Sequence, residues 1–234
     1  MDLYADAIAA HYAAYRPSLH AQILKRALPL GERFAVGLDV GCGTGYSALA
    51  LADWCDYVHA VDPSQAMLDR AMPHPRVAYQ NGAAERLPLP DASVDLVTFA
   101  GSLAYVDRDA TAAELRRVCR SGATVVCYDF EVLLGDVLSR WNVADQAVDM
   151  GYDHAVNFAD VPGFSDEPAR VERAKLEVTA VQLAHVLLSD AHRFARFAEV
   201  LGTSNPFDTL KCEIESGSGR AELSADLYSS TYRM

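Results

Sequence analysis

The chain has 234 residues, of which 51% are hydrophobic, and 32 acidic against 20 basic residues give it a net charge of −12. This composition supports a packed core, and an acidic chain without a block of Lys or Arg is a poor match for nucleic-acid or anionic membrane binding. The first residues do not look like a secretory signal, and no run approaches a spanning helix. Five widely spaced cysteines and seven histidines show no metal-ligand spacing, so we expect a cytoplasmic protein with reduced thiols and no metal site.

The first thirty residues predict two amphipathic helices. Residues 3–15 place apolar side chains at helical spacing and end before Pro17. Ser18 is expected to cap a second helix, which stops at "LPLG".

From Phe34 onward, short apolar runs alternate with helical segments. Thr111 and Glu114 have the spacing of a capping box at the start of the helix "TAAELRRVCR". Five alternations of strand and helix predict a parallel sheet covered on both faces. The expected strands are "FAVGLDV", "YVHAVD", "RVAYQ", "SVDLVTFA" and "ATVVCYDF".

Beyond Glu131 the pattern weakens. Residues 131–160 are expected to be helical, and the stretch "RAKLEVTAVQLAHVLL" is compatible with strand or helix. The segment "SDAHRFARFAEVLG" predicts a helix capped by Ser189 or Asp190. The last segments, "TLKCEIES" and "AELSADLYSSTYR", alternate like an antiparallel hairpin.

The stretch "LDVGCGTGY" places Gly41, Gly43 and Gly45 between a strand and a helix. Glycines there let a backbone approach a ligand, beside the unpaired N–H groups of the helix that follows. A dinucleotide fingerprint needs a third glycine where this chain has Tyr46. Asp39, just before the first glycine, suits a ligand that carries an ammonium group.

This stretch resembles the first motif of class I S-adenosylmethionine-dependent methyltransferases, in particular the small-molecule group similar to methyltransferase types 11 and 25. "AVDPSQAML" resembles the second motif of the family, in which the strand-end acid, here Asp62, holds the ribose hydroxyls. The same acid can start the helix that follows, and one carboxylate can serve both roles. Three more stretches agree in order, and together they cover residues 11 to about 130: "HYAAYRP", "NGAAERLPLPDASVDLVTFAGSLAYV" and "ELRRVCRSGATVVCYDF".

The resemblance implies a Rossmann-like α/β three-layer sandwich. Its sheet would have seven mostly parallel strands with an antiparallel terminal hairpin, and a small helical cap would cover the substrate. We expect one methyltransferase domain over residues 1–234. Its parts would be amino-terminal helices or a lid (1–30), a cofactor-binding core (34–130), a substrate cap (131–170) and the rest of the sheet (171–234).

The cofactor implied by the resemblance is S-adenosylmethionine, which leaves as S-adenosylhomocysteine. Ala83 stands where many relatives have Asp, so adenine contacts are expected from the backbone around it. Arg16 could pair with the methionine carboxylate. The implied cofactor-binding residues are Asp39, Gly41, Cys42, Gly43, Gly45, Tyr46, Asp62, Pro63, Met67, Ala83, Ala84, Glu85, Ala100, Tyr15 and Arg16.

The implied reaction is an in-line transfer of the sulfonium methyl group to an unidentified small-molecule acceptor. Ala104 and Tyr105 replace a histidine that relatives often have, so the catalytic candidates are Tyr105 and His154. The acceptor pocket is expected to use Tyr105, Trp141, Tyr152, His154 and Phe158. Two alternatives remain open: a cofactor-binding protein without turnover, and an NAD(P)-dependent oxidoreductase, which Tyr46 disfavours. We expect a monomer or homodimer whose only other partner is its substrate.

Overall fold

The computed structural model describes residues 8, 10, 11, 14, 15, 17–144, 152–166, 169–217 and 219–234. The chain divides into two compact units, each described by itself. The core unit consists of Ser18–Phe130, Gly151–Glu172 and Leu227–Met234. The helical unit consists of Met1–Pro17, Glu131–Met150 and Arg173–Asp226. The residues expected to form a substrate cap, 131–170, are therefore divided between the two units.

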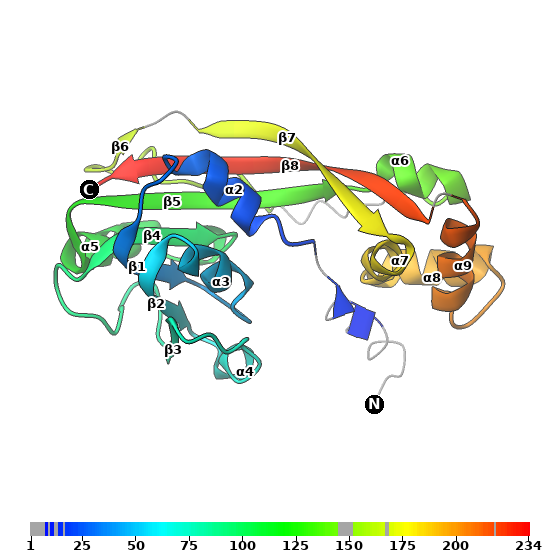
Figure 1. The fold of residues 1–234 in the computed structure, drawn as a ribbon, viewed down its shortest axis with the longest axis horizontal. Coiled ribbons are helices and arrows are strands. Elements are labelled where there is room, and N and C mark those ends of the chain that lie inside the picture. The colour runs from blue at the N-terminus through cyan, green and yellow to red at the C-terminus, as the bar shows by residue number, and fades with distance from the viewer. Residues whose placement is uncertain are drawn as a thin grey trace. The chain divides into compact units, whose positions relative to one another are not determined.

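Five parallel strands form the centre of the core unit, in the order β3-β2-β1-β4-β5 (Figure 1). Their bounds are β1 Phe34–Val40, β2 Cys55–Asp62, β3 Val77–Asn81, β4 Val94–Ala100 and β5 Cys119–Leu133. The sheet continues from β5 through β8 (Arg220–Arg233) to β6 (Ser165–Asp166), and β7 (Arg170–Thr179) also pairs with β8. The five central strands are parallel, and β6 and β8 run antiparallel to each other. This is the mostly parallel Rossmann-like α/β sheet that the sequence predicted.

Successive side chains of a strand point to opposite faces of the sheet, and apolar side chains on both faces are buried by helices. On one face, α3 (Tyr46–Ala52) packs against β1, with Leu51 beside Gly37. On the other face, Leu38 and Val40 share a buried cluster with Leu115 of α5 (Arg108–Val118). The remaining helices of this unit are α2 (His20–Ala27), α4 (Gln65–Leu68) and η1 (Leu103–Tyr105).

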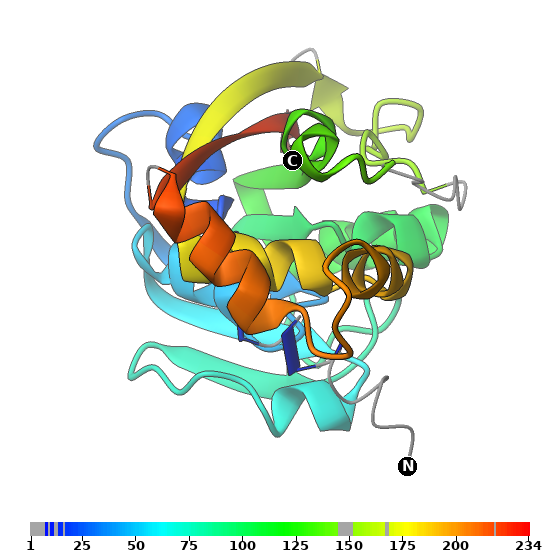
Figure 2. The same cartoon turned by 90° about the vertical axis from the view of Figure 1, so that its right-hand side faces the viewer.

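The helical unit has its own apolar core. Leu183 and Leu187 of α7 (Ala180–Leu188) are fully buried with Phe197 of α8 (Ala191–Val200) and Leu210 of α9 (Phe207–Ser216). In Figure 2 these three helices, coloured yellow to orange, lie toward the viewer. The unit also contains α6 (Gly135–Leu138) and η2 (Ser139–Trp141). Among the residues described, no helix has the length and apolar character needed to cross a bilayer.

Several element predictions were wrong in ways that packing explains. The segment "TLKCEIES" forms α9 and not a hairpin strand, because Leu210 and Ile214 are buried one helical turn apart while Cys212 between them is exposed. Residues 131–133 extend strand β5, and within the described part of residues 134–160 the helices are the short α6 and η2.

Helix starts also differ from the predictions. The helix α5 begins at Arg108, where the Asp107 carboxylate accepts the N–H groups of Asp109 and Ala110. Glu114 accepts the N–H of Leu87 and forms no capping box. The N-cap of α2 is Leu19 instead of Ser18. The predicted cap of α8 by Asp190 is confirmed, and the ambiguous stretch before it is a strand followed by a helix, β7 and α7.

Candidate functional site

The carboxyl ends of the five parallel strands meet at one edge of the core unit. Val40 pairs with Val61 and Phe99, and Ala100 pairs with Tyr128. Ligands of open α/β sheets bind outside this edge. Most of the predicted site residues, from Asp39 to Ala100, follow or end these strands and are therefore brought together.

The three glycines after β1 are needed for different reasons. All have positive φ: +72° at Gly41, +52° at Gly43 and +92° at Gly45. A Cβ at Gly41 would collide with Ser102, and one at Gly45 would collide with the Tyr79 ring. Only at Gly43 would a Cβ meet no atom within 4 Å. Internal packing alone therefore requires glycine at positions 41 and 45, and that all three glycines make room for a ligand stays a prediction.

Asp39 is fully buried beneath this loop. Its Oδ2 accepts the Ser47 hydroxyl at 2.5 Å and its Oδ1 accepts the Thr98 hydroxyl at 2.8 Å. Burial raises the pKa of Asp39 to about 6, although the two hydroxyl donors oppose the shift. The carboxylate thus joins β1 to α3 and β4, and no surface of it is exposed to a ligand's ammonium group.

Asp62 ends β2 and holds the glycine loop from the other side. Its Oδ2 accepts the N–H of Gly43 and its Oδ1 accepts the N–H of Ser64, each at 2.8 Å. The N-cap of α4 is Ser64, so Asp62 does not itself cap this helix. Only 8% of Asp62 is exposed.

The other predicted cofactor residues of the core unit surround this loop. Tyr46 and Met67 are 44% and 46% exposed, large fractions for apolar side chains. Ala83 bridges to Arg86 in a tight turn, and Glu85 accepts the N–H of Asp107 at 2.9 Å. Of the others, Pro63 is exposed, Ala100 is half-buried, and Cys42 and Ala84 are buried.

Three predicted residues are not brought to this edge by anything described. Tyr15 and Trp141 belong to the helical unit, where Trp141 Nε1 donates to Glu213 at 2.6 Å. Arg16 lies outside the described residues. Their roles stay predictions.

A polar cluster surrounds Asp129, which lies in β5 and contacts two of the predicted acceptor residues. Asp129 Oδ2 lies 2.8 Å from His154 Nδ1 and 2.8 Å from the Tyr152 hydroxyl. The Tyr152 hydroxyl is also 2.9 Å from the Gly101 carbonyl oxygen. The Tyr105 ring lies 5.8 Å from that of Tyr152, measured between centroids, and is 78% exposed at the rim of the cluster.

Phe158 is a core residue, and its expected place in the acceptor pocket is corrected. Its side chain is fully buried and stacks on Phe164, with ring centroids 4.5 Å apart. The rings of Phe99 and Tyr232 pack against it edge to face, with centroids 5.6 Å and 6.2 Å from its own.

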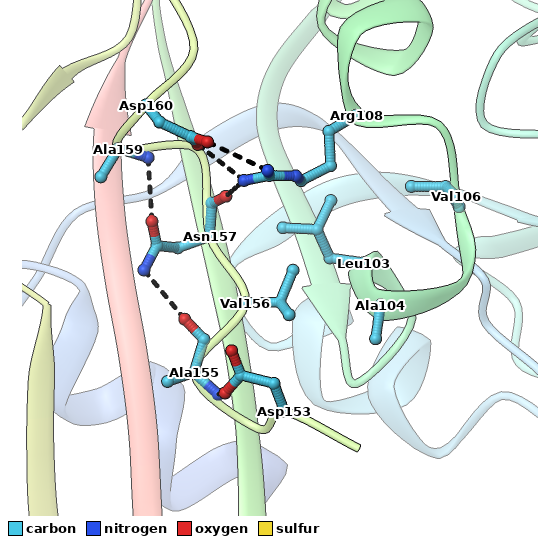
Figure 3. Close-up of a pocket in the computed structure, with 10 residues that line it drawn as sticks. All are labelled: Leu103, Ala104, Val106, Arg108, Asp153, Ala155, Val156, Asn157, Ala159 and Asp160. Atoms are coloured by element: carbon cyan, nitrogen blue, oxygen red, sulfur yellow. Dashed lines mark hydrogen bonds and ion pairs between the residues drawn. The ribbon is translucent and has the colours of Figure 1, made fainter. Parts of the chain in front are cut away.

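Figure 3 shows the residues that line an open cavity of about 440 Å³. This cavity shares lining residues with a narrow one that includes Asp129, Tyr152 and His154. Leu103, Val106 and Val156 supply the apolar wall of the open cavity. At one end Arg108 binds Asp160 through two contacts, of 2.6 Å and 3.0 Å, and also donates to the Asn157 carbonyl oxygen. This is a suitable size for a small organic molecule.

Sequence reasoning missed Asp129, Ser102 and Tyr79. Asp129 was detectable, because it is an acidic residue near the carboxyl end of the fifth predicted strand, "ATVVCYDF". The other two become apparent only through the glycines that they touch.

Comparison with known proteins agrees with this geometry. Residues 38–127 match a family model described as a methyltransferase domain. The chain is 35% identical over 112 residues to the ubiquinone/menaquinone biosynthesis C-methyltransferase UbiE of Rubrivivax gelatinosus. The matched region covers 47% of this chain and 44% of that protein. It spans less than half the length of the curated relatives it matches.

Two solved structures share the fold over most of this chain. One, from Anaeromyxobacter dehalogenans and described as a candidate type II methyltransferase, has a TM-score of 0.60 and 26% identity over 94% of this chain and 96% of that one. The other is phosphoethanolamine N-methyltransferase 2 of Haemonchus contortus, in complex with phosphomonomethylethanolamine and S-adenosylhomocysteine. It has a TM-score of 0.50 and 21% identity over 90% of this chain and 51% of that one.

Proposed function

We propose that this chain transfers a methyl group from S-adenosylmethionine to a small-molecule acceptor, because residues 38–127 match a methyltransferase domain and the fold resembles that of a candidate methyltransferase over 94% of the chain. The same fold holds S-adenosylhomocysteine in the Haemonchus contortus enzyme, which supports this class of cofactor.

The observation that carries the proposal is the pairing of Gly43 with Asp62. Gly43 has open space where a side chain would be, and its N–H is held by the Asp62 carboxylate. Each carboxylate oxygen of Asp62 accepts one backbone N–H and has a second lone pair to offer. Two neighbouring hydroxyl groups, as on a ribose, fit such a partly satisfied carboxylate.

When bound, the cofactor would supply a methyl group already activated by its sulfonium. The protein's part is then to hold donor and acceptor in line and to exclude water, which can be worth about 7–11 kcal/mol. In this proposal Gly43 and Asp62 hold the adenosyl part, and Leu103, Val106 and Val156 hold the acceptor. In this proposal Asp39 does not contact the cofactor. Its hydrogen bonds to Ser47 and Thr98 position the glycine loop.

Calorimetric titration of the purified protein tests the cofactor. We expect S-adenosylhomocysteine to bind and NADH not to bind. Asp62→Ala should weaken S-adenosylhomocysteine binding by about 10–100-fold, since a hydrogen bond to a charged group is worth about 1.5–3 kcal/mol. Asp69→Ala, which removes an exposed carboxylate seven residues along the chain, is the control and should leave the affinity within about twofold.

A protein that binds NADH but not S-adenosylhomocysteine would contradict the proposal. Transfer of label from methyl-labelled S-adenosylmethionine to a component of a metabolite extract would establish turnover. Tight cofactor binding with no labelled product would favour a binding protein without turnover.

A further inference from the structure

The cluster around Asp129 has the arrangement of an oriented general base. His154 Nδ1 lies 2.8 Å from Asp129 Oδ2, and the other carboxylate oxygen accepts the N–H of Phe130 at 2.8 Å. Tyr152 contributes a hydroxyl to the same carboxylate, and Tyr228 stacks on the imidazole with ring centroids 5.5 Å apart. Contacts with Asp129, Tyr152 and Tyr228 thus hold the His154 ring in one orientation.

This arrangement leaves one imidazole nitrogen available. A carboxylate at Asp129 can only accept a hydrogen bond, so Nδ1 must carry the hydrogen and Nε2 must carry the lone pair. Within the part of the chain that the structure describes, Nε2 has no hydrogen-bond partner, and the His154 side chain is 29% exposed. A carboxylate behind Nδ1 also stabilises the imidazolium that forms when Nε2 takes up a proton.

The cluster lies next to the glycine loop. Ser102 occupies the space that a Cβ at Gly41 would need, and its neighbour Gly101 packs against Asp129, whose Oδ1 would be 3.1 Å from a Cβ there. Two adjacent residues of the turn after β4 therefore touch the proposed cofactor loop on one side and the base cluster on the other.

The cluster also borders the open cavity. A narrow cavity lined by Asp129, Tyr152 and His154 shares four lining residues with the open one. These are Leu103, Ala104, Asp153 and Val156. An acceptor whose body lies in the open cavity can therefore direct its reacting atom toward His154.

We propose that His154 is the general base of this enzyme and that its acceptor is a phenol-type hydroxyl group, an inference that rests on the function proposed above. Asp129 and Tyr152 act as positioning residues. In the transfer step the hydroxyl oxygen forms a bond to the methyl carbon and its proton passes to His154 Nε2. The carbon–sulfur bond breaks with its electron pair going to sulfur, so the positive charge leaves the cofactor and appears on the imidazolium.

The chemistry of the cluster favours a hydroxyl over an ammonium acceptor. Asp129 Oδ2 accepts hydrogen bonds from both Tyr152 and His154, and Oδ1 accepts the N–H of Phe130, so what the cluster chiefly offers an incoming group is the base at His154. Such a site suits an acceptor that arrives neutral and must lose a proton. A phenol, with a pKa of about 10, is within reach of an imidazole base, whereas an aliphatic alcohol is far too weak an acid. The exposed ring of Tyr105 at the rim can stack on an aromatic acceptor.

The first test is a transfer assay with methyl-¹³C-labelled S-adenosylmethionine, a panel of phenols with the matching anilines and benzyl alcohols, and a metabolite extract. We expect the label in an O–CH₃ group on a phenol. His154→Ala should lower kcat by about 10²–10⁴-fold, with partial rescue by added imidazole, and should change S-adenosylhomocysteine affinity less than twofold. His192→Ala, which removes a half-buried imidazole of the helical unit, is the control.

Asp129→Asn and Tyr152→Phe test positioning. An amide at 129 can donate to Nδ1, which would shift the imidazole hydrogen to Nε2 and abolish the base. We expect a large loss of kcat with KM little changed, and a smaller loss in Tyr152→Phe. Nitrogen-15 spectra of the histidines, with His154 assigned by its loss in His154→Ala, should show the Nδ1–H tautomer in the wild-type protein and the Nε2–H tautomer in Asp129→Asn.

The outcomes separate the two proposals. Label on nitrogen or carbon, an unchanged kcat in His154→Ala, or an Nε2–H tautomer in the wild-type protein would overturn the inference while the methyltransferase function stood. Failure to bind S-adenosylhomocysteine, or binding without any labelled product, would instead remove the proposed function on which it rests.

Discussion

Gly43 is the position at which the proposed cofactor site can be tested with least disturbance of the protein. Gly41 and Gly45 abut Ser102 and Tyr79, so a side chain at either would damage packing whether or not a ligand binds. Gly43→Ala adds a methyl group on the open side of the loop. Gly31 has φ of +85° and equally open surroundings, which makes Gly31→Ala a matched control.

The two variants should lose the same stability for the same reason. An L-residue in the left-handed region costs about 1–2 kcal/mol, and neither new methyl group meets a protein atom. Both should therefore unfold at a lower urea concentration by about the same amount. Only Gly43→Ala should bind S-adenosylhomocysteine more weakly. A tenfold loss corresponds to about 1.4 kcal/mol, and a methyl group placed between ligand and backbone should cost at least that.

Urea unfolding followed by the fluorescence of the two tryptophans, Trp54 and Trp141, measures the stability loss. Calorimetry measures the affinity. If Gly43→Ala binds S-adenosylhomocysteine as tightly as Gly31→Ala does, then the open side of Gly43 is not where the ligand lies, and the argument from the glycine loop fails.

Two further predictions concern the buried residues beside the site. Burial raises the pKa of Asp39 from 3.8 to about 6, so the folded protein keeps this proton to a higher pH than the unfolded chain does. Relative to Asp39→Asn, the wild-type protein should therefore lose about 3 kcal/mol of stability as the pH rises from about 4 to 6 and change little above that, in unfolding measured across this range. A difference that is constant with pH would refute this. Phe158→Ala should lower the unfolding free energy by about 3–5 kcal/mol, as removal of a fully buried ring does. A near-zero change in the same assay would mean that Phe158 lines a pocket and is not a core residue.

The alternating part of the fold was predictable because buried parallel strands are almost continuously apolar. The run "FAVGLDV" became β1 with the predicted bounds, Phe34–Val40. The carboxyl part was harder, because a short segment can satisfy two periods at once. Leu210, Cys212 and Ile214 alternate as in a strand, yet Leu210 and Ile214 also lie one helical turn apart. Only the packing of α9 in the helical unit decides between them.

The candidate site was predictable in part, for a similar reason. Motif spacing identifies residues at the ends of β1 and β2, since these follow their strands directly. The contact between Asp129 and His154 joins residues 25 positions apart, across a segment whose sequence has no clear periodic pattern. Sequence reasoning could nominate His154 and Tyr152 separately, but nothing in the sequence indicates that one carboxylate holds both.

The turn after β4 links the two halves of the reaction in a way that matters for engineering. Gly101 and Ser102 are neighbours in the chain, and one packs on Asp129 while the other fills the space beside Gly41. A designer who enlarges this turn to admit a bulkier acceptor will also push on the loop proposed to grip the methyl donor. Acceptor selectivity and donor affinity should therefore change together in libraries built there.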